Sequence, residues 1–294
     1  MNRITKPQLW AMLLIPDSFL LICFQGKLNI MTLIGIAAGI SAQAAVLLPI
    51  AVLCEKKEHF PKWIMLIVLI YIIFSGGLLM NRSHTASHVL YIPFENTNEF
   101  IILALIALVC LYMSSTGIKA LARASVIAAT VGVLYLVILS VSAVIRSDYA
   151  NIERAWETSG FMSAFLQSFL LTGGFGTAAA LFGITKGKAV SSLSGYFIAR
   201  VIISAVIIFS SILTAGGISA ITDFPVITAA QISQPFSSQR IDSLLLIIFS
   251  VFAVFSTATQ SAAAAYLIRQ IFPKFRRFRS VAAIAAIAAV SFMI

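Results

Sequence analysis

Charged residues are scarce in this chain of 294 residues. Lys, Arg, Asp and Glu together account for 10% of it, and 60% is hydrophobic. Soluble domains carry about 25% charged residues, so this composition excludes an ordinary soluble fold. The mean hydropathy of +1.02 instead predicts an all-α polytopic membrane protein, in which residues 1–294 form a single membrane domain.

Cysteines and catalytic motifs are also few. The three cysteines, Cys23, Cys54 and Cys110, lie in or beside apolar segments and show neither a disulfide framework nor a metal-ligand spacing. The sequence has no phosphate-binding P-loop, no GxSxG elbow, no HExxH and no CxxC motif. These absences argue against an enzyme and against an ATP-driven pump, and we expect no catalytic residue, cofactor or metal.

Acidic residues number only 10 against 20 basic ones, which gives a net charge of +10. The basic residues fall mainly in short loops between apolar runs, where they indicate membrane topology rather than nucleic-acid binding. If the N-terminus is cytoplasmic, 14 of the 20 basic residues lie inside: Arg3, Lys6, Lys56, Lys57, Lys62, Lys119, Arg123, Lys186, Lys188, Arg269, Lys274, Arg276, Arg277 and Arg279. We therefore expect a cytoplasmic N-terminus.

Apolar runs of about 20 residues, the length that crosses a bilayer, predict eight spans and a short ninth. The predicted spans are Leu9–Phe24, Ile30–Cys54, Trp63–Met80, Phe100–Met113, Ala124–Ile145, Phe161–Ile184, Val190–Ala215, Ile241–Leu267 and Val281–Ile294. The last segment reaches about 21 Å as a helix, short of the roughly 30 Å hydrocarbon core. We expect a C-terminally short protein with about eight or nine spans.

Three connections are long enough to carry structure. Asn81–Glu99 is predicted to be an outer loop. Arg146–Gly160 mixes charged and aromatic residues, as in an amphipathic helix at the outer interface. Gly216–Arg240 is predicted to contain another interfacial helix at Val226–Ile232.

The span Phe161–Ile184 carries Gly173, Gly174 and Gly176 near its middle. Glycine costs roughly 1 kcal/mol relative to alanine in a helix interior, so the cluster suggests a helix that breaks partway across the membrane. The alternative is that the small residues allow close helix packing, which is the better interpretation of this segment alone.

The first span carries Pro16, Asp17 and Ser18 at its centre. One interpretation is a buried kink, with Asp17 bonded to backbone freed by the proline. The other is an unwound helix whose backbone, with Asp17 and Ser18, faces a central cavity. Interruptions in the first helix of each half predict two inverted five-helix repeats, at about residues 8–145 and 161–294, with a binding site between them.

Two other features have simpler interpretations. Arg200 lies within a span, where it can pair with an acid, bond to backbone carbonyls or extend towards the inner surface. We favour the last of these. Gly35 and Gly39 form a small-xxx-small pattern, which predicts helix packing.

Three short motifs stand beside the predicted spans. They are Ile4-Thr5-Lys6-Pro7-Gln8-Leu9 before the first, Gly117-Ile118-Lys119-Ala120-Leu121-Ala122-Arg123 between the fourth and fifth, and Phe224-Pro225 followed by Gln239-Arg240-Ile241-Asp242-Ser243-Leu244 before the eighth. Together they resemble the GerAB family of spore germination proteins, the spore permeases of the amino acid–polyamine–organocation superfamily. The first is similar to that family's lead into its first helix, the second to its Gly-Ile-x-x-x-Ala-Arg inner loop, and the third to a passage before its eighth helix.

The resemblance implies a LeuT-type fold of inverted five-helix repeats. It also implies a role in the spore inner membrane as a subunit of a nutrient germinant receptor, assembled with an A-type subunit and a lipoprotein C-type subunit. An amino acid or similar nutrient would bind at a centre formed by Pro16, Asp17, Ser18, Gly173, Gly174, Phe175, Gly176 and Thr177. Family members often carry an acid at the position of Thr177. The alternatives are an ion-coupled secondary amino acid transporter and a truncated, non-transporting paralogue.

Overall fold

The computed structural model describes residues 4–56, 61–90, 99–145, 151, 159–185, 188–216, 218, 222–233, 241–275 and 278–294. Almost all of these residues are helical. The helices are α1 (Lys6–Ile22), α2 (Ile30–Lys56), α3 (Lys62–Leu90), α4 (Glu99–Ser115), α5 (Ile118–Ile145), α7 (Phe161–Leu170), α8 (Gly173–Leu181), η2 (Phe182–Ile184), α9 (Ala189–Ala215), α10 (Pro225–Ser233), α11 (Ile241–Ile271), η4 (Pro273–Phe275) and α12 (Arg279–Met293). Each predicted span corresponds to one helix or, for Phe161–Ile184, to a helix pair with a short 3₁₀ turn.

Six segments of the described chain are long and apolar enough to cross a bilayer: Ile30–Val52, Lys62–Ala86, Ile118–Ile145, Phe161–Ile184, Ala189–Ala215 and Ile247–Ile271. The helices α1, α4 and α12 are shorter, at 17, 17 and 15 residues. Large apolar side chains are exposed along the outside of the bundle, such as Leu108, Ile127 and Val144, each more than 60% exposed. Exposed apolar surface of this extent is what lipid covers, and the protein is a multi-pass membrane protein.

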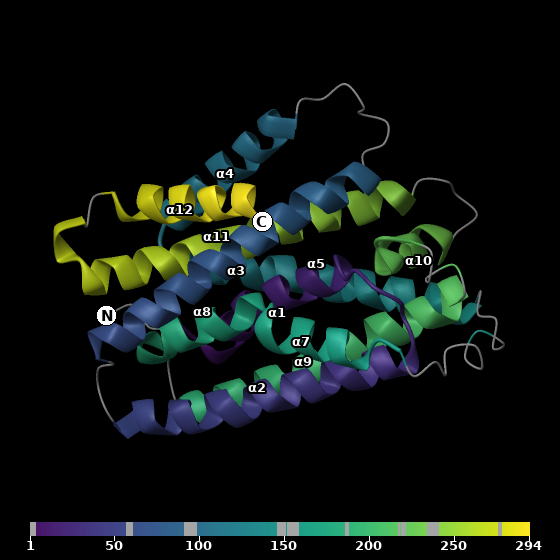
Figure 1. Ribbon diagram of the computed structural model, residues 1–294, viewed down its shortest axis with the longest axis horizontal. Helices are drawn as coiled ribbons and strands as arrows, with labels where there is room; N and C mark the ends of the chain where they lie inside the picture. The colour runs from purple at the N-terminus through teal and green to yellow at the C-terminus, as the bar shows by residue number, and fades with distance from the viewer. Residues whose placement is uncertain are drawn as a thin grey trace.

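The helix α1 lies in the middle of the bundle (Figure 1). The helices α2 and α9 lie on one side of it, and α3, α11 and α12 lie on the other, with α4 outermost. Residues on every side of α1 are buried, including Met12, Leu13 and Phe19. A helix that is apolar all round belongs in a core, and any polar group on α1 must find its partner inside the protein.

The start of α1 is fixed by local bonds. The Thr5 N–H donates to Gln8 Oε1 at 3.0 Å, which is one half of a capping box. The Ile4 N–H donates to the Ile184 carbonyl oxygen at 2.8 Å. The motif Ile4–Leu9 therefore ties the start of α1 to the end of the interrupted helix pair α7–α8.

The two predicted interruptions have different outcomes. The first is wrong, because α1 runs without a break from Lys6 to Ile22 with Pro16 inside it. A proline removes one N–H donor from a helix, and here the apolar turns on either side still continue the helix across it.

The second interruption is confirmed, but its position differs from the prediction. The helix α7 ends at Leu170, where the Leu171 N–H still donates to the Gln167 carbonyl at 3.0 Å. Thr172 is extended, with φ −118° and ψ 139°, and α8 starts at Gly173. The break therefore lies just before the glycine cluster, which forms the first turn of α8.

The predicted connections also have mixed outcomes. Residues 81–90 are helical rather than loop, because α3 continues to Leu90. The hydroxyls of Ser83 and Thr85 donate to the carbonyls of Met80 and Asn81, so these polar residues are accommodated within the helix. Residues 226–232 lie within α10, as predicted. Most of the predicted helix in Arg146–Gly160 lies outside the described residues.

The packing role of Gly35 and Gly39 is confirmed. A Cβ atom placed on Gly35 would lie 2.5 Å from the Phe161 carbonyl oxygen, and one on Gly39 would lie 2.8 Å from that of Phe165. The helices α2 and α7 therefore approach each other more closely than any side chain at these positions would allow.

The substitution Gly39→Ala tests this close approach. We expect it to lower the free energy of unfolding by about 1–3 kcal/mol, because the added methyl group forces α7 away from α2. The measurement is denaturant unfolding of the detergent-purified protein. Gly183→Ala is the matched control, since a Cβ on Gly183 would meet nothing within 4 Å. Equal stability of the two variants would contradict the packing role.

Candidate functional site

The break between α7 and α8 exposes backbone carbonyls that have no partner within a helix. Side chains from other helices bond to them. The Ser168 carbonyl accepts from Arg200 Nη2 at 3.2 Å. The Phe169 carbonyl accepts from Gln43 Nε2 at 2.6 Å. The hydrocarbon core holds no water that could bond to these carbonyls, so side chains of α2 and α9 supply the hydrogen-bond donors.

The next carbonyls of the break are bonded from the opposite side of the bundle. The Tyr71 hydroxyl on α3 lies 2.9 Å from the Leu170 oxygen and 3.0 Å from the Thr172 oxygen. Gln260 Nε2 on α11 donates to the Gly173 oxygen at 2.6 Å. Every carbonyl from Ser168 to Gly173 except that of Leu171 thus accepts a bond from a side chain of another helix.

Gln260 joins the break to the rest of α8. Its Oε1 atom accepts from the Ser75 hydroxyl at 3.3 Å and from the Thr177 hydroxyl at 3.2 Å. All three side chains are buried. Thr177 is therefore held in an internal network between α8 and α11.

Asp17 lies at the N-terminus of α8. Its Oδ1 atom accepts the Gly174 N–H at 3.0 Å, and its Oδ2 atom accepts from the Tyr196 hydroxyl and lies 3.2 Å from Arg200 Nε. The exposed fractions of Asp17 and Arg200 are 7% and 6%. A carboxylate is favoured at a helix N-terminus by the aligned peptide dipoles. The Asp17 carboxylate is therefore stabilised both by the N-terminus of α8 and by the positive charge of Arg200.

The expectation that Arg200 extends towards the membrane surface is wrong. Its guanidinium bonds to Asp17, to the Gln43 side-chain oxygen and to the Ser168 carbonyl. A guanidinium presents five donors in a planar fork and is the side chain best suited to several buried acceptors. If it extended away, the buried carboxylate of Asp17 would lose its counter-charge, which is costly.

The glycines of α8 allow α1 to approach the break. A Cβ atom on Gly173 would lie 2.5 Å from the Pro16 Cβ, and one on Gly174 would lie 2.6 Å from Asp17 Oδ2. The first contact places the turn of α1 that contains Pro16 against α8, and the second leaves the Gly174 N–H accessible to the carboxylate. Both interpretations of the cluster are therefore correct, since the chain breaks here and the glycines provide close packing.

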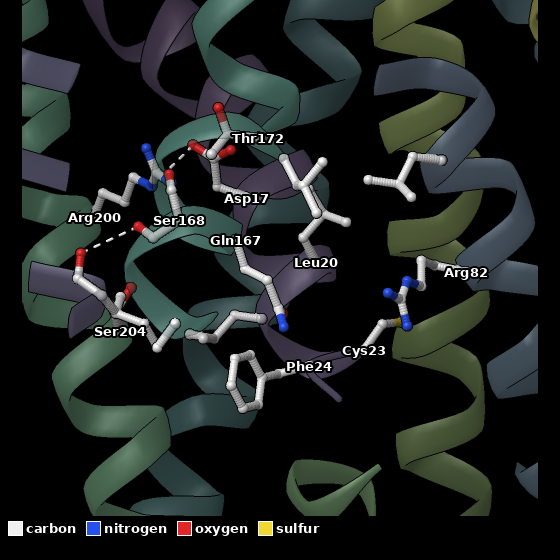
Figure 2. A pocket seen from close by; sticks show the side chains of 15 residues that line it. Asp17, Leu20, Cys23, Phe24, Arg82, Gln167, Ser168, Thr172, Arg200 and Ser204 are labelled. Atoms are coloured by element: carbon white, nitrogen blue, oxygen red, sulfur yellow. Dashed lines mark hydrogen bonds and ion pairs between the residues drawn. The ribbon is translucent and has the colours of Figure 1, made fainter. Parts of the chain in front are cut away.

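A small cavity lies beside this ion pair (Figure 2). Its polar lining comes from four helices and from the break itself: Asp17, Arg82, Gln167, Ser168, Thr172, Arg200 and Ser204. The space open to water-molecule centres is about 50 Å³, enough for a few water molecules. Figure 2 shows Asp17 and Arg200 near one end of the cavity and Arg82 beside Cys23 at the other. Among the described lining residues two are cationic and one is acidic.

The structure brings most of the predicted site residues to one place but not into one cavity. Asp17 lines the cavity. The others are Pro16, Gly173 and Gly174 at the contact between α1 and α8, Ser18 buried within α1, Phe175 and Gly176 against Tyr71, and Thr177 bonded to Gln260. Their part in binding a ligand stays a prediction.

The side chains that bond to the carbonyls at the break were not predicted from the sequence. Gln43 and Gln260 lie in the middle of apolar spans, and polar residues at that depth seek internal partners. This depth could have predicted that both glutamines bond to buried polar groups. Tyr71 and Tyr196 gave no such signal, because a tyrosine in an apolar span usually packs as an aromatic side chain.

The fold occurs among solved structures. The chain is similar to Mhp1, a nucleobase-cation-symport-1 family transporter in a closed conformation with bromovinylhydantoin bound. The TM-score is 0.68 at 14% sequence identity, over 99% of this chain and 72% of Mhp1. This likeness confirms the expected LeuT-type transporter fold. No protein-family model and no curated protein sequence matches the chain.

The ion pair predicts a specific pattern of mutant stabilities. Asp17→Asn leaves the Arg200 guanidinium buried without its counter-charge, and we expect a loss of about 3–5 kcal/mol in the free energy of unfolding. The double variant Asp17→Asn/Arg200→Gln removes both charges. We expect it to be more stable than additivity predicts, with a coupling of about 1–3 kcal/mol.

Denaturant unfolding in detergent measures the two single variants, Asp17→Asn and Arg200→Gln, and the double variant. Asp223→Asn, the same change at an exposed acid, should stay within about 0.5 kcal/mol of the unmodified protein. Additive effects of the two substitutions would show that the charges do not depend on each other.

Tyr71→Phe tests the hydrogen bonds at the break. The variant keeps the ring that packs edge-on against Phe175 at 5.5 Å but removes the donor for the Leu170 and Thr172 carbonyls. We expect a loss of about 1–3 kcal/mol in the free energy of unfolding. Tyr112→Phe, at a tyrosine on α4 that is 69% exposed, removes the same hydroxyl elsewhere and should have no effect. An unchanged Tyr71→Phe variant would mean that the carbonyls find other donors.

Proposed function

We propose that this chain is the membrane subunit of a nutrient germinant receptor of the GerAB type, and that it senses a small zwitterion such as an amino acid. One observation carries the proposal. A buried carboxylate and a buried guanidinium, from α1 and α9, pair directly at the helix break, on the wall of a polar cavity.

The two charged groups match the two charges of an amino acid. The Asp17 carboxylate would bind its ammonium group, and the Arg200 guanidinium would bind its carboxylate through two parallel N–H donors. Arg82 gives the described cavity lining one more cation than acid, which favours ligands that carry a carboxylate. In the ligand-free protein, Asp17 and Arg200 neutralise each other.

Ligand binding on this mechanism requires movement. The cavity has room for only a few water molecules. An amino acid would therefore fit only if Asp17 and Arg200 separate and enlarge it. Asp17 bonds to the first turn of α8, and Arg200 bonds to the last turn of α7. Separating the pair therefore moves the two half-helices relative to each other. Such a two-state element is what a receptor needs to pass a signal to its partners.

The three family-like motifs support a receptor. The resemblance implies A-type and C-type partner subunits and the spore inner membrane, whereas the distribution of basic residues predicts the cytoplasmic N-terminus. The likeness to a transporter supports the second candidate, an ion-coupled secondary amino acid transporter that uses the same site by alternating access. A truncated paralogue that only assembles into a complex is the third, and it requires no ligand.

A thermal-shift panel with the detergent-purified protein tests the ligand. Alanine carries both charges, propionate only the carboxylate and ethylamine only the ammonium. We expect alanine or a larger amino acid to raise the melting temperature by mass action, and the two single-charge compounds to have a much smaller effect. Asp17→Asn should lose the response, and the exposed control Asp223→Asn should keep it.

Because Asp17→Asn also destabilises the protein, Gln167→Leu serves as a second variant. It changes the cavity wall without touching the ion pair and should weaken binding in a folded protein. Ion-gradient-driven uptake into liposomes would then identify a transporter, whereas binding without uptake would identify a receptor. A folded protein that responds to no amino acid, alone or with its partner subunits, would contradict a ligand-binding role.

A further inference from the structure

A second, larger cavity lies at the end of η2, away from the break between α7 and α8. Its volume is about 530 Å³, within the range of sites that bind small molecules. Ile184, which ends η2 and bonds to Ile4, lines it. The cavity therefore lies at the end of the bundle where α1 begins, which the distribution of basic residues predicts to be cytoplasmic.

The charged lining of this cavity is entirely cationic. Lys119 comes from the start of α5, Arg269 from the last turn of α11 and Arg279 from the start of α12. None of the described residues that line it is acidic. Three cations from three helices around one space favour an anionic ligand.

Helix ends add to the positive potential. The helices α5 and α12 both begin at this cavity, and neither has an acidic residue in its first turn. The first N–H groups of a helix have no partner within it and carry a partial positive charge. The hydroxyls of Ser114 and Thr116 donate to backbone carbonyls, so an anion would take its hydrogen bonds from the cations, the helix N–H groups, Tyr266 and Gln270.

Apart from Ser114, Thr116, Tyr266 and Gln270, the remaining lining is apolar. Ile184, Ala262 and Ala265 are buried, whereas Arg269 is exposed. A ligand that fits has an anionic group near the cations and an uncharged part against the alanines of α11.

We propose that this cavity binds a phosphate group, carried by an anionic phospholipid or by a soluble phosphate ester. Basic spaces between membrane helices on the cytoplasmic side are suited to phosphate headgroups. This site is separate from the Asp17–Arg200 pair and does not depend on the function proposed above.

The experiment measures the thermal stability of the full chain in nanodiscs. One arm adds inorganic phosphate to phosphatidylcholine discs, with chloride at equal ionic strength as reference. The other arm replaces part of the phosphatidylcholine with phosphatidylglycerol. The variants are Arg269→Gln and Arg279→Gln, and the matched control is Lys274→Gln, an exposed cation at the same end that does not line the cavity.

We expect each of the two cavity variants to weaken the apparent affinity about fivefold, and Lys274→Gln to leave it unchanged. A response to phosphatidylglycerol alone identifies a lipid as the source of the phosphate, and a response to inorganic phosphate identifies a soluble one. Phosphate also stabilises proteins by exclusion from their surface, so the difference between variants is the readout. An equal response of all variants, or an equal loss in Lys274→Gln, would overturn the proposal.

Discussion

A helix that breaks inside a membrane must have its freed backbone groups bonded by the protein, because lipid offers no donors. The rest of this structure depends on that constraint. Gln43, Tyr71, Arg200 and Gln260 reach the break from four helices and bond to its carbonyls. These bonds connect α2, α3, α9 and α11 to the break.

One of these donors, Arg200, is charged, and a buried charge requires a counter-charge. The guanidinium of Arg200 satisfies the Ser168 carbonyl but brings a buried positive charge, which Asp17 balances from α1. Replacing a buried ion pair with apolar side chains often stabilises a protein, so such a pair is weak support for a purely structural role. Its position at the junction of two half-helices fits the proposed switch, in which a ligand with both charges would replace the internal contact.

The sequence predicts the apolar helices, the break in Phe161–Ile184 and the burial of Asp17, because hydropathy, glycine clusters and an acid within an apolar span are local signals. It does not predict that α1 continues through Pro16, since a proline alone does not decide between a kink and an unwound turn. The partner of Arg200 was also missed. Residues 17 and 200 are far apart in sequence, and their contact depends on how α1 and α9 pack, which hydropathy does not encode.

The most direct measurement is the separation of Asp17 and Arg200 in a structure determined with saturating amino acid. At present Arg200 Nε lies 3.2 Å from Asp17 Oδ2. We predict that the ligand lies between them, with its ammonium on Asp17, its carboxylate on Arg200 and the direct contact broken. A ligand bound elsewhere, with the ion pair intact, would contradict the proposed switch.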